Sequence, residues 1–170
     1  MELPSINELK LLLKTDDPIG KLMDNLNCLS KFVLTYSDYI FKSRDYGTGD
    51  FLSMMEAHVL TDIVDNPGTT VTELAKVWDR TTSAISQTVR KLIRNDYVYR
   101  VNCQDNARVF FLYPTEKAKV FAAAHKEYDK RGTIESRLQL LEKFTEEEIE
   151  IFYAVMEEFT KIIQKANKAE

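Results

Sequence analysis

The chain has 170 residues, a formal net charge of −4 at pH 7 and a mean hydropathy of −0.31. This length suits one domain with a sizeable core, or a small domain joined to an assembly region, and five glycines with four prolines exclude a long flexible linker. Because there is no apolar run of about eighteen residues and no charged-then-apolar amino terminus, we predict neither a membrane span nor a signal peptide and expect a cytoplasmic protein.

Two helices are predicted before residue 45. Ser5 and Glu8 have capping-box spacing ahead of a short helix that ends at about Leu13. Residues 15–18 then end this helix and begin another, with Pro18 in its first turn. Apolar residues continue at helical spacing to about residue 42, at Ile19, Leu22, Met23, Leu26, Leu29, Val33 and Ile40.

Residues 46–49 are predicted to be a loop, residues 53–65 a helix and residues 66–68 a turn. Residues 71–98 then have the pattern of two short amphipathic helices joined by a tight polar turn. An N-cap at Thr72 is predicted to start the first of these helices, with Leu74, Ala75 and Trp78 on its apolar face.

The second short helix is predicted to be capped by Thr81 or Thr82 and to bury Ile85, Val89 and Leu92. Its other positions are polar, at Ser83, Ser86, Gln87 and Arg90. Hydroxyl and amide groups at the amino-terminal end of a helix suit base edges in a major groove, so the pair of helices is typical of a helix-turn-helix. The alternative is an ordinary solvated helix face.

Two β-type runs follow, at residues 97–102 and 108–113, and a polar segment separates them. They predict a hairpin, or wing, flanked by Arg100 and Arg108. Residues 69–115 hold seven Lys and Arg against four acidic residues, a net charge of +3, so the remainder of the chain carries −7. A basic module in an acidic chain favours a polyanionic partner.

Two further helices are predicted after the wing. Thr115 caps a helix that extends through Leu141 with a possible bend near Gly132, and Thr145 with Glu148 forms a capping box for the last helix. The last helix has an apolar stripe at Ile149, Phe152, Met156, Phe159 and Ile163. Because a small winged helix cannot cover this stripe and that of the long amino-terminal helix, we expect a second copy of the chain as partner.

The segment from about residue 54 to residue 117 resembles the MarR family of bacterial winged-helix transcriptional regulators. The resemblance rests on Glu73-Leu-Ala75, Ser83-Ala-Ile-Ser86, Val89-Arg-Lys-Leu92, Tyr97-Val98 and Thr115-Glu-Lys117. The chain departs from the family at the wing, where Asn106-Ala-Arg108 and Pro114-Thr115 replace the usual Asp-x-Arg and Leu-Thr. Arg108 is retained, but its usual acidic companion is not.

The resemblance implies a mainly α fold with a small β-hairpin wing, and a winged helix-turn-helix joined to a helical dimerisation region. The expected domains are dimerisation helices at residues 1–45, a DNA-binding domain at 53–115 and further dimerisation helices at 116–170. The expected partners are double-stranded DNA, a second copy of the chain and a small aromatic or phenolic effector, with no membrane partner.

The candidate DNA-binding residues are Arg80, Thr82, Ser83, Ser86, Gln87, Arg90, Arg100 and Arg108. Tyr36, Tyr39 and His58 are the candidate effector-binding residues, and most other aromatic residues are expected in the core. Cys28 is either a small core residue or an oxidation sensor. The two histidines, His58 and His125, fit satisfied helix side chains better than a zinc site, and no cofactor, metal or catalytic motif is predicted.

Together these features predict a homodimeric, sequence-specific DNA-binding regulator, by default a repressor, that acts on a palindromic operator. A ligand between the dimer helices and the DNA-binding heads would then change the spacing of the two heads. The rival interpretation is an interaction or ligand-binding adaptor that keeps the winged-helix fold without binding DNA.

Overall fold

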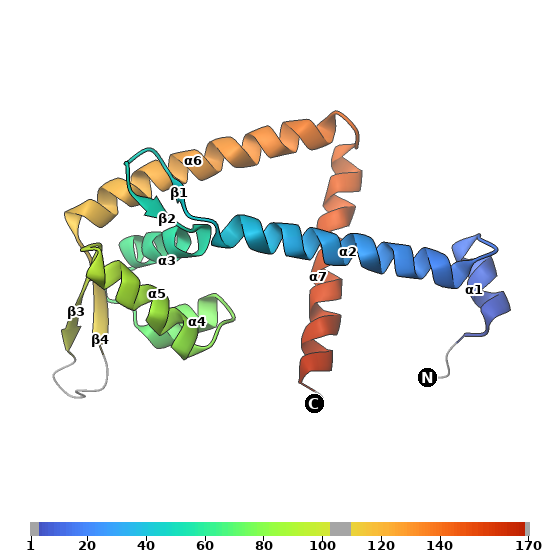
Figure 1. The fold of residues 1–170 in the computed structure, drawn as a ribbon, viewed down its shortest axis with the longest axis horizontal. Helices are drawn as coiled ribbons and strands as arrows, with labels where there is room; N and C mark the ends of the chain where they lie inside the picture. The colour runs from blue at the N-terminus through green and yellow to red at the C-terminus, as the bar shows by residue number, and fades with distance from the viewer. Residues whose placement is uncertain (1–3, 103–109, 169–170) are drawn as a thin grey trace. The chain divides into compact units, whose positions relative to one another are not determined.

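The computed structural model describes residues 4–102 and 110–168. The chain separates into two compact units, Met1–Ala122 and Ala123–Glu170. No helix in the described ranges is long and apolar enough to cross a membrane. The elements are shown in Figure 1 and run in the order α1 (Ile6–Leu13), α2 (Pro18–Phe41), β1 (Arg44–Asp45), β2 (Phe51–Leu52), α3 (Met54–Asp65), α4 (Val71–Val77), α5 (Thr82–Arg94), β3 (Val98–Asn102), β4 (Phe110–Pro114), α6 (Glu116–Leu141) and α7 (Glu146–Asn167).

The two amino-terminal helices begin where the sequence predicts. The Ser5 side chain and Glu8 form the expected capping box of α1. Asp17 caps α2 by accepting a hydrogen bond from the backbone N–H of Gly20 at 2.9 Å, and Pro18 fills the first helical position. Pro18 is the only buried residue of α2, and most apolar side chains of this helix are exposed to solvent.

The segment predicted as a loop at residues 46–49 is the turn of a small hairpin, β1–β2. Asp45 Oδ1 accepts hydrogen bonds from the backbone N–H groups of Gly47, Thr48 and Gly49 at 2.8 to 3.0 Å. The N–H of Gly47, then that of Gly49, lowers the pKa of the Asp45 carboxyl. Gly47 and Gly49 have φ values of 98° and 80°, which side-chain-bearing residues rarely adopt, so the turn depends on both glycines.

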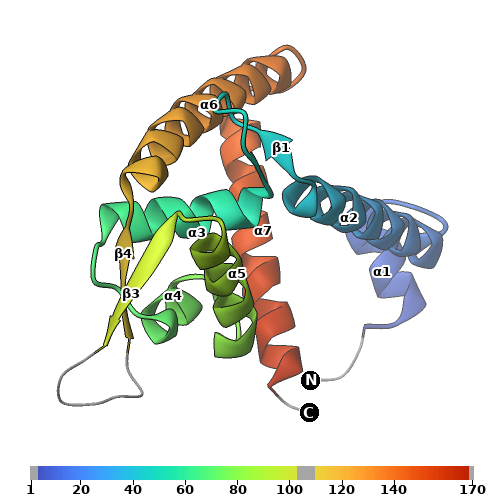
Figure 2. The ribbon, with the colours of Figure 1, turned by 60° about the vertical axis from the view of Figure 1, so that its left-hand side comes forward.

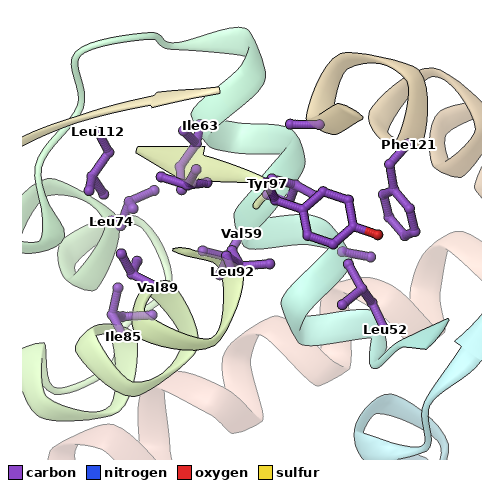
Figure 3. Packing of buried hydrophobic residues seen from close by; sticks show 14 of the residues in the cluster. Leu52, Val59, Ile63, Leu74, Ile85, Val89, Leu92, Tyr97, Leu112 and Phe121 are labelled. Carbon is purple, nitrogen blue, oxygen red and sulfur yellow. The ribbon is translucent and has the colours of Figure 1, made fainter. Parts of the chain in front are cut away.

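The core of the first unit gathers around α3, as Figure 3 shows. Tyr97 lies between Phe121 and Leu52 in that view, and its ring meets the ring of Phe121 edge-on at 5.5 Å between centroids. Burial of Tyr97 raises the pKa of its hydroxyl above the ordinary value. Truncating a buried side chain of this size to alanine typically costs about 3–5 kcal/mol, so these rings hold the start of α6 against the winged helix.

Helix α4 starts two residues earlier than predicted, because its N-cap is Thr70 rather than Thr72. Thr70 has extended backbone angles, and its hydroxyl accepts a hydrogen bond from the backbone N–H of Glu73 at 3.2 Å. The Glu73 carboxylate accepts one from the backbone N–H of Thr70 at 2.7 Å. The Thr-x-x-Glu spacing of a capping box therefore identifies the helix start better than the onset of the apolar period does.

Strands β3 and β4 pair antiparallel, with Tyr99 opposite Tyr113 and Val98 opposite Pro114. β3 begins one residue after the predicted start, because the backbone N–H of Tyr97 still bonds to Leu92 O at the end of α5. The predicted start of the second strand, residues 108–109, lies outside the described residues.

The second unit consists of the rest of α6 together with α7. α6 continues as helix through Gly132, and Thr145 with Glu148 forms the predicted capping box of α7. The Arg137 guanidinium hydrogen-bonds to Glu146 and, at 2.5 Å, to Glu150. These two carboxylates raise the pKa of Arg137, and they tie α6 to the first turns of α7.

Candidate nucleic-acid interface

Helix α5 has the two-sided character that its sequence predicts. Thr81 caps it by accepting a hydrogen bond from the backbone N–H of Ala84 at 3.2 Å. Ile85, Val89 and Leu92 are buried at 3% exposure or less. Helix α4 packs against α5, and the β3–β4 hairpin follows it in the chain (Figure 2). The buried stripe fixes which side of α5 faces the core and leaves the other side free for contacts.

The free side of α5 carries a continuous row of polar groups. Ser83, Gln87, Arg90 and Arg94 recur at helical spacing and are all exposed. Thr82 is exposed in the first turn, whereas Ser86 is half-buried at the margin of the row. We call these six residues the polar face of α5. Its amino-terminal half offers hydroxyl and amide groups and its carboxy-terminal half offers two guanidinium groups.

Arg94 was missed as a candidate contact in the sequence, although its spacing of four residues from Arg90 is a usable signal. Arg90 and Arg94 point to the same side because residues four apart are neighbours on a helix. Within residues 4–102 and 110–168, the guanidinium groups of Arg80, Arg90 and Arg94 form no hydrogen bond or ion pair. These three cations are therefore available to anionic groups.

Lys91 lies between Arg90 and Arg94 in the sequence, but it has a different role. Lys91 Nζ lies 2.6 Å from Glu56 Oε1, at the start of α3. Glu56 also accepts a hydrogen bond from the backbone N–H of Ser53 at 2.9 Å through its other oxygen. Lys91 thus anchors α5 to α3 and is not one of the available cations.

The turn before α5 is held in a left-handed conformation at Asp79, which has a φ of 46°. The backbone N–H of Arg80 bonds to Ala75 O at 3.0 Å, which closes the carboxy-terminal end of α4. The Arg80 side chain is exposed beside the first turn of α5. The first backbone N–H groups of a helix attract anions, so Arg80 adds positive charge where the helix dipole is already favourable.

On the hairpin, Arg100 is exposed, and its guanidinium carbon lies 4.6 Å from the centre of the Phe110 ring. This cation–π contact holds the Arg100 side chain over the hairpin while its charge faces solvent. Arg108 lies outside the described residues, and so does Cys103.

A groove of about 410 Å³ runs along one side of α5. It is lined by Phe41, Ser53, Met55, Glu56, Arg80, Ala84, Ile85, Gln87, Thr88, Lys91 and Arg94. Apolar side chains from α2 and α3 form one part of it, and cationic or amide groups from α5 and its preceding turn form another. Arg80 and Gln87 therefore belong to the groove as well as to the predicted DNA-contact set.

The predicted effector residues Tyr36, Tyr39 and His58 do not line this groove. Tyr36 and Tyr39 stack on each other along the exposed side of α2, with ring centres 6.2 Å apart. His58 instead packs its ring on Trp78 at 5.6 Å. Cys28 is exposed on α2, so its interpretation as a small core residue is wrong, because α2 buries nothing beyond its first residue.

His125 is buried in the second unit, and its Nε2 lies 3.1 Å from a carboxylate oxygen of Asp129, one helical turn further along α6.

The sequence of this chain is similar to one family model and to two known regulators. The model of the MarR family matches residues 52–110. YhjH, an uncharacterized HTH-type transcriptional regulator of Bacillus subtilis, is 30% identical over 106 residues, which are 62% of this chain and 59% of YhjH. The chain thus spans less than two thirds of that relative. YybA, an uncharacterized HTH-type transcriptional regulator of the same organism, is 25% identical over 150 residues, which are 86% of this chain and 91% of YybA.

Among solved structures, the fold is similar to that of Lactococcus lactis ZitR in complex with DNA. The TM-score is 0.64 at 18% sequence identity, and the match covers 84% of this chain and 97% of that one. At this identity the likeness concerns the fold alone, and it confirms the mainly helical architecture with a small β-hairpin wing.

Proposed function

We propose that this chain is a member of the MarR family, whose model matches residues 52–110, and that it is a sequence-specific DNA-binding transcriptional regulator, by default a repressor. It acts as a homodimer on a palindromic operator. The regulators YhjH and YybA are similar to it in sequence, and ZitR, which is similar in fold, has been solved with DNA.

The polar face of α5 is the observation that carries the proposal. A helix that buries Ile85, Val89 and Leu92 presents only hydroxyl, amide and guanidinium groups on its opposite side. Ser83 and Gln87 suit base edges, and Arg90 and Arg94 suit phosphates. The free guanidinium groups of this face, together with Arg80 and Arg100, concentrate positive charge in a chain of net charge −4.

Homodimer formation is supported by the apolar side chains that each unit leaves exposed. On α2 these are Ile19, Leu22, Met23, Leu26, Phe32, Val33, Leu34, Tyr36, Tyr39 and Phe41. On α7 they are Ile151, Phe152, Tyr153, Val155, Ile162 and Ile163. Because exposed apolar surface on this scale favours association, and because symmetric dimers are the commonest oligomers, the partner is a second copy. Two DNA-binding heads then match two half-sites.

The effector is a small aromatic or phenolic molecule, for which Tyr36, Tyr39 and His58 stay the predicted contacts and the groove beside α5 is a second candidate site. Phe41 and Met55 offer apolar contacts, while Arg80 and Arg94 offer positive charge to a carboxylate or phenolate. A ligand in this groove would occupy Arg80 and Gln87, so it would compete directly with DNA for the same side chains.

The test is a selection of genomic fragments by the purified protein at near-physiological salt, followed by binding measurements between 50 and about 200 mM salt. The proposal expects enrichment of a palindrome with half-sites about ten base pairs apart and a steep fall of affinity with salt. Protein that is dimeric and folded but shows neither enrichment nor salt dependence would support the adaptor interpretation instead.

A further inference from the structure

The turn between α4 and α5 determines where the amino-terminal end of α5 lies. α4 ends at Val77, Trp78 follows as its C-cap, and Asp79 adopts the left-handed conformation. Thr81 then caps α5. Asp79, Arg80 and Thr81 are all exposed, so these three residues add no buried side chain to the core.

Trp78 connects this turn to α3. Its indole N–H donates a hydrogen bond to Asp62 Oδ2 at 2.7 Å, across sixteen residues of sequence. The ring of His58 packs on the same indole at 5.6 Å between centres. Since His58 and Asp62 are four residues apart in α3, they are neighbours on one side of that helix, and both contact the indole of Trp78.

A second directional contact holds α5 further along its length. Lys91 Nζ lies 2.6 Å from Glu56 Oε1, so α3 holds α5 at Lys91 and the preceding turn at Trp78. α5 also contacts the core through its buried apolar residues Ile85, Val89 and Leu92, and apolar contacts set distance better than direction. Two directional contacts, one at each end, fix the orientation of a helix, whereas one leaves it free to pivot.

We infer that Trp78 is a positioning residue, which through its hydrogen bond to Asp62 aims the amino-terminal end of α5, and with it Thr82 and Ser83, at the bases. This inference rests on the proposed DNA-binding function. Phosphate contacts tolerate a small change in helix direction because they follow flexible cationic side chains. Base contacts do not, because they need short side chains at defined positions.

The test compares three variants with the wild-type protein. Trp78→Phe keeps an aromatic ring against His58 but removes the N–H donor, and Asp62→Leu removes the acceptor. Asp62→Asn keeps an oxygen that can accept the same hydrogen bond and serves as the conservative rescue. Ile63→Val is the matched control, because it loosens the core of α3 without touching the pair, as Ile63 is fully buried.

The affinity for the selected fragment is divided by the affinity for random duplex of the same length. Trp78→Phe and Asp62→Leu are expected to lower this ratio about tenfold, with random-duplex binding changed less than about twofold. Asp62→Asn and Ile63→Val are expected to keep the ratio. An unchanged ratio in Trp78→Phe, or an equal fall in Ile63→Val, overturns the positioning role.

Hydrogen exchange separates this inference from the proposed function because it needs no DNA. The backbone N–H groups of Arg80 and Ala84 bond to Ala75 O and Thr81 Oγ1. Asp62→Leu is expected to accelerate exchange at both, and to accelerate exchange of the single indole N–H in the chain. Unchanged exchange at Arg80 and Ala84 would overturn the inference. Exchange could be accelerated in Asp62→Leu while the wild-type protein prefers no DNA fragment. That result would contradict both the proposed function and the role of Trp78 in directing α5 toward the bases, and the contact between Trp78 and Asp62 would then be purely structural.

Discussion

Lys91 on α5 and Glu56 on α3 form an ion pair with 2.6 Å between Nζ and Oε1. The Glu56 side chain is 13% exposed and that of Lys91 39% exposed, so the pair is partly shielded from water. Glu56 has a second role in the capping box of α3, where it accepts from the backbone N–H of Ser53. One carboxylate therefore both caps the start of α3 and holds α5 against it.

Glu56→Gln is expected to lower the free energy of unfolding by about 1 kcal/mol, because the amide keeps the capping box and loses the ion pair. Urea denaturation measures the change. Glu158→Gln is the control, since its pair with Lys161 on α7 is solvent-exposed and its loss should cost a few tenths of that amount. Equal losses in the two variants would contradict a special role for the pair between α3 and α5.

Arg90→Gln is expected to weaken binding to the selected operator and to random duplex by similar factors. The reason is that a guanidinium on the middle of the polar face neutralises a phosphate whatever the base sequence. The slope of log affinity against log salt should flatten by about 0.9. Lys130→Gln, an exposed change of equal charge on α6, should leave the slope unchanged. A sequence-dependent loss in Arg90→Gln would assign it to base contact instead.

Gln87→Ala is expected to reduce affinity for the selected operator about tenfold and affinity for random duplex hardly at all. The reason is that an amide in contact with a base edge favours the correct base over a wrong one by about 1–3 kcal/mol. Competition binding with labelled operator measures both affinities. Thr88→Ala, the next residue and half-buried beside the groove, is the matched control. Equal losses on both duplexes would remove Gln87 from base recognition.

The double substitution Leu26→Glu and Val33→Glu is expected to weaken self-association about a hundredfold, because it places two charges on the exposed apolar stripe of α2. Sedimentation equilibrium measures the dissociation constant. Lys31→Glu adds a carboxylate on the opposite side of the same helix and should leave the dimer intact. A double variant that remains fully dimeric would show that α2 lies outside the interface.

Glu73 gives the stability of the protein a defined dependence on pH. The backbone N–H of Thr70, and next its hydroxyl, lower the pKa of the Glu73 carboxyl in the folded protein. The stabilisation is therefore fully present above the unfolded-state value of about 4.3, and it is lost as the pH falls through the lowered folded-state pKa.

Glu73→Gln is accordingly expected to flatten the dependence of the urea midpoint on pH between about pH 5 and pH 3. Glu135→Gln, at an exposed position of α6, should keep the wild-type profile. A Glu73→Gln profile that falls as steeply as the wild type would contradict the contribution of this capping box.

Much of the local structure could be predicted from short-range patterns. The capping residues Ser5, Ser53, Thr81 and Thr145 start helices because each hydroxyl accepts from a backbone N–H three residues on, which is a local event. The stripe of Ile85, Val89 and Leu92 could be read from helical spacing in the same way, and it identified the polar face of α5 opposite to it. The cap at Thr70 was equally local, but the prediction placed it at Thr72.

Contacts between distant segments could not be predicted, because no periodicity records them. Nothing in the sequence says that Asp62 accepts from the Trp78 indole, or that Lys91 pairs with Glu56 while Arg90 and Arg94 pair with none of the described residues. The sequence alone determined the helices, the hairpin and the polar character of α5, since these follow from spacing and capping. Only the tertiary structure decided which cations are engaged, which side chains line the groove and what holds the turn before α5, because each depends on residues that meet through packing across the core.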